Sequence, residues 1–360
     1  MEWFENNEIA EIAQTIVRFN KNEITGKVVD LEHLGKPKFP KEALGHLAEM
    51  GFLWGVANEE TGGINMSPIT TVVVLSKLAE ASAGFAAIVA AHYAAVQSIQ
   101  LVPGGDDFLK TIGTDSLIGI SLNNDVEILK DHSSDSSPTG QSINFIPAPQ
   151  QTAYTIVFDK AGTDFQMYIV KRGDFDNCVK KEICLSGCDE IPLVRIFSGE
   201  DFLKKLKPIS EGKYAENAYH YLLSLMKLYL SAIMQGSARS ATVSALKYTT
   251  ERFQTGKIII EHQNVRKKII DMEIKNQAMA SFVYRAAHNQ FNHTGFDLCD
   301  MLFAFTGAEA EYVCNEAIQS LGGYGYMKEY GLEKKLRDIK TLQAFMSCSL
   351  MDWLGLKHSR

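Results

Sequence analysis

The sequence lacks the apolar run of roughly 20 residues that a helix needs to cross a bilayer. It also lacks any Lys or Arg before Arg18, and its first turns carry the acidic residues Glu2, Glu5, Glu8 and Glu11. A secretory signal peptide has a basic start followed by an apolar stretch, so we expect no signal peptide. These absences predict a cytoplasmic protein without a membrane span.

Positive charge and metal-binding patterns are scarce as well. The chain has 43 Asp and Glu against 36 Lys and Arg, which gives a formal net charge of −7. Nucleic acid selects for a basic surface, so it is not an expected partner. Among the six cysteines, Cys184 and Cys188 form the one close pair, and neither a second pair nor a His cluster completes a zinc site. We therefore expect reduced thiols and no metal site.

The composition that remains is that of a globular enzyme, with 46% hydrophobic and 22% charged residues in a chain of 360. Three regions differ in pattern. Helical periodicity dominates residues 1–114, runs of strand length such as 154–158 and 166–170 mark residues 115–210, and long helical patterns fill residues 211–360. We predict an α+β fold with an N-terminal helical domain, a middle β domain and a C-terminal four-helix bundle within these boundaries.

The C-terminal region has the strongest helical pattern. Apolar and small residues recur at a spacing of three to four along its first helix, at Leu222, Leu225, Met226, Tyr229, Ile233 and Gly236. Further long helices are expected at about 262–290 and 298–320. Helices of this length are typical of bundles that continue across a subunit boundary. The same seam places Met226 and Tyr229 either around an apolar chamber or in plain core.

Two segments of this region suggest ligand binding. Segment 248–257 ends the first long helix with Arg252, whose guanidinium fork matches the oxygens of a phosphate. Segment 317–326 contains Gly322 and Gly323, which lack side chains and so let a backbone approach a ligand closely. In the alternative interpretation, Arg252 is a surface cation at a helix end and the glycines form a helix cap and turn.

In their order and spacing these segments resemble the acyl-CoA dehydrogenase family. The resemblance rests on residues 39–63, 248–263, 317–326 and 337–340, arranged around a β domain of the right size. It implies the family's helical, β and helical-bundle architecture, with FAD as cofactor and an acyl-CoA thioester as substrate.

Carried over to this chain, the resemblance assigns a role to Arg252, which would bind the pyrophosphate of an FAD held mainly by a neighbouring subunit. Gln319, Gly322 and Gly323 would lie beside the adenosine half of the same FAD. The implied cofactor site is therefore shared between subunits.

The family's catalytic base is missing from the positions where the resemblance places it. Dehydrogenation needs a carboxylate within hydrogen-bond reach of the substrate's α-proton. In most members this Glu follows the Arg-Asp-x-Lys segment, a position held here by Met346, and in a minority it lies on the first long bundle helix, where this chain has Met226. Methionine accepts no proton, so we assign no catalytic residue and expect Asp338 to fix the local turn.

The β domain departs from the family too. Its Thr-Glu-Pro and Gly-Ser-Asp phrases, which hydrogen-bond the flavin ring, have no convincing counterpart in residues 121–125 or 131–140. The aromatic-Ile-Thr-Asn strand is only echoed by residues 145–148. The β-domain segments that would hold the chain's own flavin are thus the segments that differ most from the family.

These departures lead to four hypotheses. In the first, this chain is one subunit of a hetero-oligomer, expected to be a tetramer, and completes the FAD site of a related acyl-CoA dehydrogenase subunit that supplies the base and passes electrons to an electron-transferring flavoprotein. The second is an active homomeric dehydrogenase with a relocated base. The third is a flavin-dependent monooxygenase of the same fold, and the fourth a binding or assembly protein without flavin. The retained Arg252 and Gly322–Gly323 favour the first.

Overall fold

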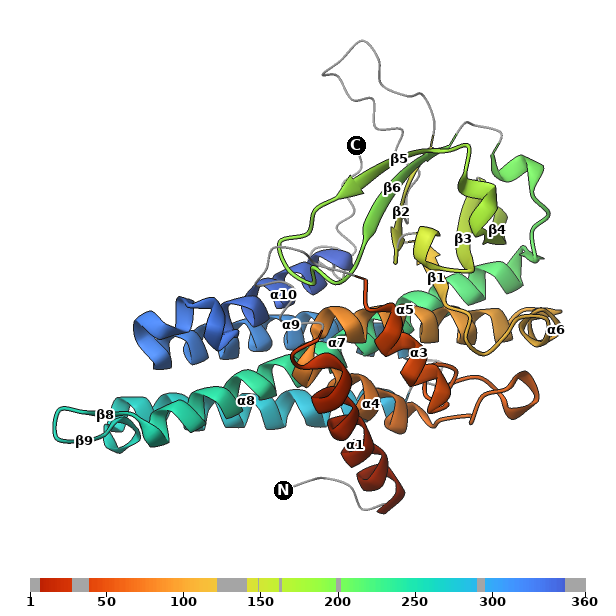
Figure 1. Ribbon diagram of the computed structural model, residues 1–360. Coiled ribbons are helices and arrows are strands. Elements are labelled where there is room, and N and C mark those ends of the chain that lie inside the picture. Colours follow the sequence, from red (N-terminus) through yellow and green to blue (C-terminus); the bar gives the residue numbers. More distant parts are fainter. Residues whose placement is uncertain are drawn as a thin grey trace, which may run out of the picture.

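The computed structural model describes residues 7–27, 39–121, 141–147, 149–161, 164–198, 202–289 and 295–346. Figure 1 shows the long helices together, with a sheet lying along one side of them. Shorter helices come first in the chain, the sheet second and the longest helices last. The predicted order of helices, β domain and helical bundle is confirmed, whereas the boundaries at residues 114 and 210 stay predictions.

The N-terminal helices begin and end where local sequence signals place them. Ser67 and Ser82 cap α4 and α5, since their hydroxyls accept the peptide N–H of Thr70 at 3.1 Å and of Phe85 at 3.0 Å. Gly51, at φ 79°, follows the end of α3, where a glycine readily adopts the left-handed conformation. The elements are α1 (Asn7–Phe19), η1 (Asn20–Ile24), α3 (Lys41–Glu49), η2 (Glu59–Thr61), α4 (Pro68–Ala81), α5 (Ala83–Gln100) and α6 (Gly105–Lys110).

The sheet has the order β5-β6-β2-β1-β3-β4-β7, and β1 pairs parallel with β3 while the other pairs are antiparallel. Its link to the helices starts at β1, where the N–H of Ile118 donates to Nδ1 of the buried His92 on α5 at 3.1 Å. The strands are β1 (Ile118–Ser121), β2 (Gln141–Ile146), β3 (Tyr154–Ala161), β4 (Asp164–Lys171), β5 (Val179–Ile183), β6 (Leu193–Ser198) and β7 (Ser210–Glu211). Short 3₁₀ segments η3 (Pro149–Gln151), η4 (Arg172–Phe175) and η5 (Leu203–Lys205) connect them.

The C-terminal bundle is organised around α7, which packs against α4, α5, α8 and α9. Gly236 lets α7 approach α4 closely, because an added Cβ there would lie 2.0 Å from the carbonyl oxygen of Ser76. The elements are α7 (Lys213–Glu251), β8 (Phe253–Gln254), β9 (Lys257–Ile258), η6 (Ile259–Glu261), α8 (Gln263–His288), α9 (Gly295–Leu321), η7 (Gly322–Tyr326), η8 (Lys328–Tyr330) and α10 (Leu332–Phe345).

Membrane-spanning helices and metal-binding clusters were both considered from sequence, and the described residues bear on each. No helix in this part of the chain is both long and apolar enough to cross a membrane. Within the same residues, His, Cys, Asp and Glu side chains do not gather in a group of three or more that could hold a metal ion. Cys184 is exposed and Cys188 is buried.

Candidate functional site

Arg252 lies immediately after the C-terminal end of α7, where its peptide N–H donates to the carbonyl of Tyr248 at 2.9 Å. The chain then forms the β8–β9 hairpin, whose turn contains Gly256 at φ 83°. The hairpin folds back on the helix end, because the N–H of Ile259 donates to the carbonyl of Arg252 at 2.9 Å. This leaves the Arg252 side chain exposed at one end of the bundle.

The glycine loop after α9 lies beside Arg252. The guanidinium carbon of Arg252 is 5.8 Å from the centre of the Tyr324 ring, in the geometry of a cation–π contact. Tyr324 also contacts Tyr248 at 6.2 Å and Tyr330 at 5.5 Å between ring centres. In Figure 1, β8 and β9 lie at the end of the bundle where the chain passes from α9 to α10. The fold therefore brings together the two segments that sequence analysis singled out.

The three glycines of this loop differ in what they require. Gly322 has φ +60°, which disfavours any side chain. A Cβ on Gly325 would lie 2.3 Å from the carbonyl oxygen of Ile318, so packing demands a glycine there. Gly323 has neither constraint, because its φ is not positive and an added Cβ would meet no described atom within 4 Å. The open space above Gly323 is a surface that another molecule can approach.

Gln319 lies one turn before this loop, near the end of α9, and is exposed. Together with Arg252, Gly322 and Gly323 it gives one end of the bundle a cation, an amide and bare backbone. These groups fit a phosphate-bearing ligand such as the pyrophosphate and adenosine part of FAD. All four residues are exposed, and their role in cofactor binding stays a prediction.

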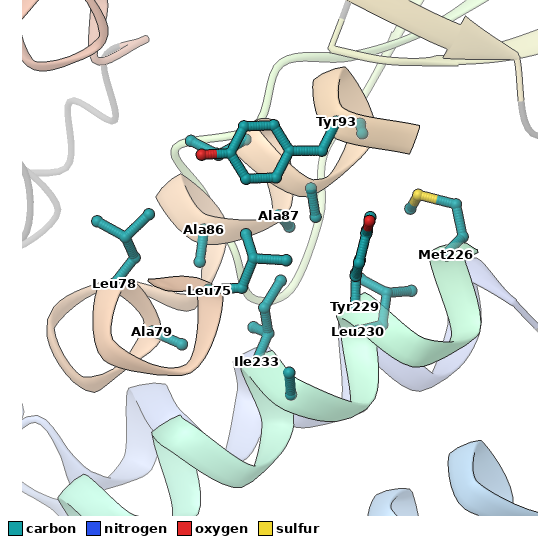
Figure 2. Packing of buried hydrophobic residues seen from close by; sticks show 14 of the residues in the cluster. Leu75, Leu78, Ala79, Ala86, Ala87, Tyr93, Met226, Tyr229, Leu230 and Ile233 are labelled. Carbon is teal, nitrogen blue, oxygen red and sulfur yellow. The ribbon is translucent and has the colours of Figure 1, made fainter. Parts of the chain in front are cut away.

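The two methionines at the expected base positions lie in the large hydrophobic core. Met226 on α7 is 1% exposed and Met346, just after α10, is 8% exposed. Figure 2 shows Met226 and Tyr229 pointing from α7 toward α5. The hydroxyl of Tyr229 donates to the side-chain oxygen of Gln97 on α5, and burial raises the pKa of Tyr229 well above its ordinary value. This neighbourhood supplies a neutral hydroxyl and apolar groups.

Asp338 belongs to a buried ion network with Glu190 and Lys334. Its carboxylate accepts the N–H of Cys188 at 2.6 Å and the ammonium of Lys334 at 3.0 Å. Lys334 also pairs with Glu190 at 3.3 Å, and the hydroxyl of Ser82 donates to Glu190 at 2.9 Å. Asp338 therefore holds the β5–β6 connection against α10, which is a structural role.

Sequence analysis missed Glu190 and Lys334 as members of this network. The i,i+4 spacing of Lys334 and Asp338 was an available signal, since such pairs are neighbours on a helix face. Nothing local pointed to Glu190, which lies in the β domain.

Much of the expected flavin-ring region, residues 122–140 together with residue 148, lies outside the described residues. The neighbouring strands are described: Ser121 at the end of β1 pairs with Phe145 on β2. The expectation that this region departs from the family stays a prediction.

Comparison with known proteins assigns the chain to a family. The model of the acyl-CoA dehydrogenase N-terminal domain matches residues 6–110, and that of the acyl-CoA dehydrogenase C-terminal domain matches residues 218–346. The chain therefore belongs to the acyl-CoA dehydrogenase family, as its motifs predicted, and it has the predicted fold.

Individual relatives show how far this similarity extends. Benzylmalonyl-CoA dehydrogenase of Aromatoleum aromaticum is 25% identical over 91% of each chain. Cyclohexane-1-carbonyl-CoA dehydrogenase of Geobacter metallireducens is 36% identical, over 41% of this chain and 40% of the relative. The structure of butyryl-CoA dehydrogenase from Megasphaera elsdenii superposes with a TM-score of 0.83 at 18% identity, covering 99% of this chain and 98% of that one. The FAD complex of PigA reaches a TM-score of 0.79 at 19% identity, covering 99% and 100%.

Proposed function

We propose that this chain is the companion subunit of a heteromeric acyl-CoA dehydrogenase. A related subunit supplies the catalytic carboxylate and most of the FAD site, and this chain completes that site. The observation that carries the proposal is the exposed grouping of Arg252 with Gly322 and Gly323, set against buried methionines at both base positions, Met226 and Met346.

The residues of this chain act by binding and positioning. Arg252 donates its planar fork of N–H groups to the pyrophosphate, a geometry that Lys cannot reproduce. Gly322 and Gly323 let the loop backbone reach the adenosine half, and Gln319 offers both donor and acceptor groups to it. FAD, when bound, supplies the hydride acceptor for α,β-dehydrogenation of an acyl-CoA thioester. The partner's carboxylate takes the α-proton, because this chain has Met where the family has a base.

An exposed apolar surface on the bundle supports a partner. Val243 and Leu246 on α7 and Ile270 and Ile274 on α8 are all exposed. The ion pair between Arg239 and Glu273, at 3.6 Å, joins the same two helix faces. Exposed apolar side chains with charged groups nearby are typical of protein interfaces.

Electron transfer out of the assembly follows from the same proposal. The electrons would leave the partner's FAD for an electron-transferring flavoprotein. One relative, 33% identical over 35% of this chain, is named as a subunit of the caffeyl-CoA reductase–Etf complex of Acetobacterium woodii. That name supports an electron-transferring flavoprotein as the acceptor.

Substituting Arg252 tests the proposal in the mixed assembly, obtained by co-expression with a dehydrogenase-like product of a neighbouring gene. We expect Arg252→Ala to weaken FAD binding at least tenfold, which corresponds to about 1.4 kcal/mol, with no loss of folding because the side chain is exposed. Arg18→Ala is the matched control, an exposed cation near the end of α1.

Two results would count against the companion role. Full FAD content in the Arg252→Ala assembly contradicts the shared site. A chain that purifies alone with FAD and oxidises acyl-CoA points to a relocated base, and oxygen-dependent turnover points to a monooxygenase.

A further inference from the structure

One face of α7 carries large side chains toward α4 and α5. Met226, Tyr229 and Ile233 follow at a spacing of three to four, which places them on one face of a helix. Figure 2 shows all three projecting toward the two N-terminal helices. The facing helix α5 is rich in alanine, with Ala86 and Ala87 drawn opposite. Large residues from one helix thus fill the space that small residues leave on the other.

Burial shows that this space is filled. Tyr229 and Tyr93 are both 0% exposed. A side chain that borders a water-sized cavity retains accessible surface, so no such cavity borders these two rings. Ligand pockets are typically about 300 Å³ or larger, so an acyl chain needs far more room than a single water. Met226 is itself only 1% exposed, so no space of that size opens onto its side chain.

Tyr229 is fixed in this position by its polar end. Its hydroxyl donates to Gln97, and the two residues lie 132 positions apart, so the bond joins α7 to α5. Burial raises the pKa of Tyr229 well above 10, so the hydroxyl stays a donor throughout the ordinary pH range. A buried hydroxyl without this partner would be costly, so the bond adds to the packing that holds the fully buried ring.

We propose that Tyr229, held by Gln97, is a plug that excludes acyl thioesters from the interior of this chain. A base at position 226 would have to reach the substrate's α-carbon. A substrate of this chain would therefore use the space between α7 and α5 that Tyr229 fills. The inference rests on the proposed function and deepens it: the assembly binds acyl-CoA at the partner's sites alone. Tyr229 is then the residue that keeps the acyl chain out of this subunit, beside the missing base at positions 226 and 346.

Binding of octanoyl-CoA tests the plug, measured by titration calorimetry on the chain as purified, with free CoA as the reference that isolates the octanoyl tail. We expect wild type and Tyr229→Phe, which keeps the ring, to bind octanoyl-CoA no better than CoA. Tyr229→Ala removes the ring, and we expect it to bind octanoyl-CoA at least tenfold more tightly than CoA. Tyr229→Val serves where the Ala variant does not fold.

Tyr168→Ala is the matched control. Tyr168 is also a buried tyrosine whose hydroxyl donates to a glutamine, Gln166, at 2.6 Å, but it belongs to a second, smaller hydrophobic core that includes residues of β3, β4 and β6. We expect it to lose stability without gaining octanoyl-CoA binding.

Two outcomes overturn the plug: tail-dependent binding by the wild type, or no tail-dependent binding by any folded variant that lacks the Tyr229 ring. Neither outcome depends on whether the chain binds flavin. A chain that failed to share FAD would still exclude the octanoyl tail, and a chain with an open interior would bind the tail whatever its FAD content.

Discussion

Gly323 and Gly325 lie two residues apart in the loop after α9 and face different surroundings. Alanine at Gly325 would clash with the carbonyl oxygen of Ile318, whereas alanine at Gly323 would meet open space. We expect Gly325→Ala to destabilise the chain by about 1–3 kcal/mol through overpacking. Gly323→Ala should leave the melting temperature unchanged and lower the FAD content of the mixed assembly. Equal FAD content in wild type and Gly323→Ala would remove this glycine from the cofactor site.

His92 makes the stability of the chain depend on pH. Burial lowers its pKa to about 3, against about 6.5 for an exposed imidazole. The unfolded chain binds a proton below about pH 6.5, while native His92 stays neutral down to about pH 3. The stability that the neutral ring contributes is therefore complete above about pH 6.5 and is lost as pH falls from there toward 3.

Replacing His92 checks this dependence. Between about pH 6.5 and 4.5 we expect the free energy of unfolding of the wild type to fall by up to about 1.4 kcal/mol per pH unit from this one proton. His92→Gln keeps an acceptor for the N–H of Ile118 and takes up no proton. Its free energy of unfolding, measured by urea titration at each pH, should therefore change less steeply with pH by that amount. Parallel slopes would show that His92 is not the titrating group.

Some residues of the candidate site were predictable from sequence and others were not. Arg252 and Gly322 lie in segments that resemble the family's motifs, so the sequence singled them out before the contact between Arg252 and Tyr324 was known. Tyr229 and Gln97 carry no such signal, because their hydrogen bond joins positions 132 residues apart. Pairings of that kind depend on how whole helices pack.

At the scale of the helices, Gly236 and Gly45 both lie inside helices but have opposite surroundings. An alanine Cβ at Gly236 would lie 2.0 Å from the carbonyl oxygen of Ser76 on α4, whereas at Gly45, inside α3, it meets no described atom within 4 Å. We expect Gly236→Ala to cost about 1–3 kcal/mol or more, because two helix backbones must separate. Gly45→Ala should stabilise the chain by about 0.4–1 kcal/mol.

Thermal and urea unfolding of both variants measure the difference. A Gly236→Ala chain as stable as the wild type would mean that α7 and α4 can separate without loss. It would contradict the close approach of α7 to α4 at Gly236.

Helices were better predicted than strands, for physical reasons. The caps Ser67 and Ser82 and the glycine after α3 are local signals of a kind that a sequence can carry, whereas strand pairing is not local. Strands β2 and β6 lay outside the predicted runs. Their pairing partners lie far along the chain, as with Gln141 opposite Ser198.

At the scale of the whole molecule, the Glu190–Lys334–Asp338 network ties the sheet to the helices. Removing Lys334 leaves two carboxylates in a buried place without their cation, so we expect Lys334→Met to cost about 3–5 kcal/mol. Lys340→Met is the control on the same helix, because Lys340 pairs with Glu311 at a half-exposed site and its loss should cost at most about 1 kcal/mol. Similar losses in urea unfolding would refute the network's role.

The fold of the family persists here at low sequence identity. The chain superposes on butyryl-CoA dehydrogenase with a TM-score of 0.83 at only 18% identity. Its helical order, its β domain and its family followed from sequence, because patterning and motifs survive at low identity. Its domain boundaries and flavin-ring region stay predictions.

The most direct test of the companion role is the FAD content and native mass of the chain, purified alone and then with its co-expressed dehydrogenase-like partner. We predict that the chain alone binds no FAD, and that the co-expressed sample is a mixed tetramer with half as many FAD molecules as subunits. A homomeric assembly of this chain alone, carrying one FAD for every subunit, would contradict the proposal.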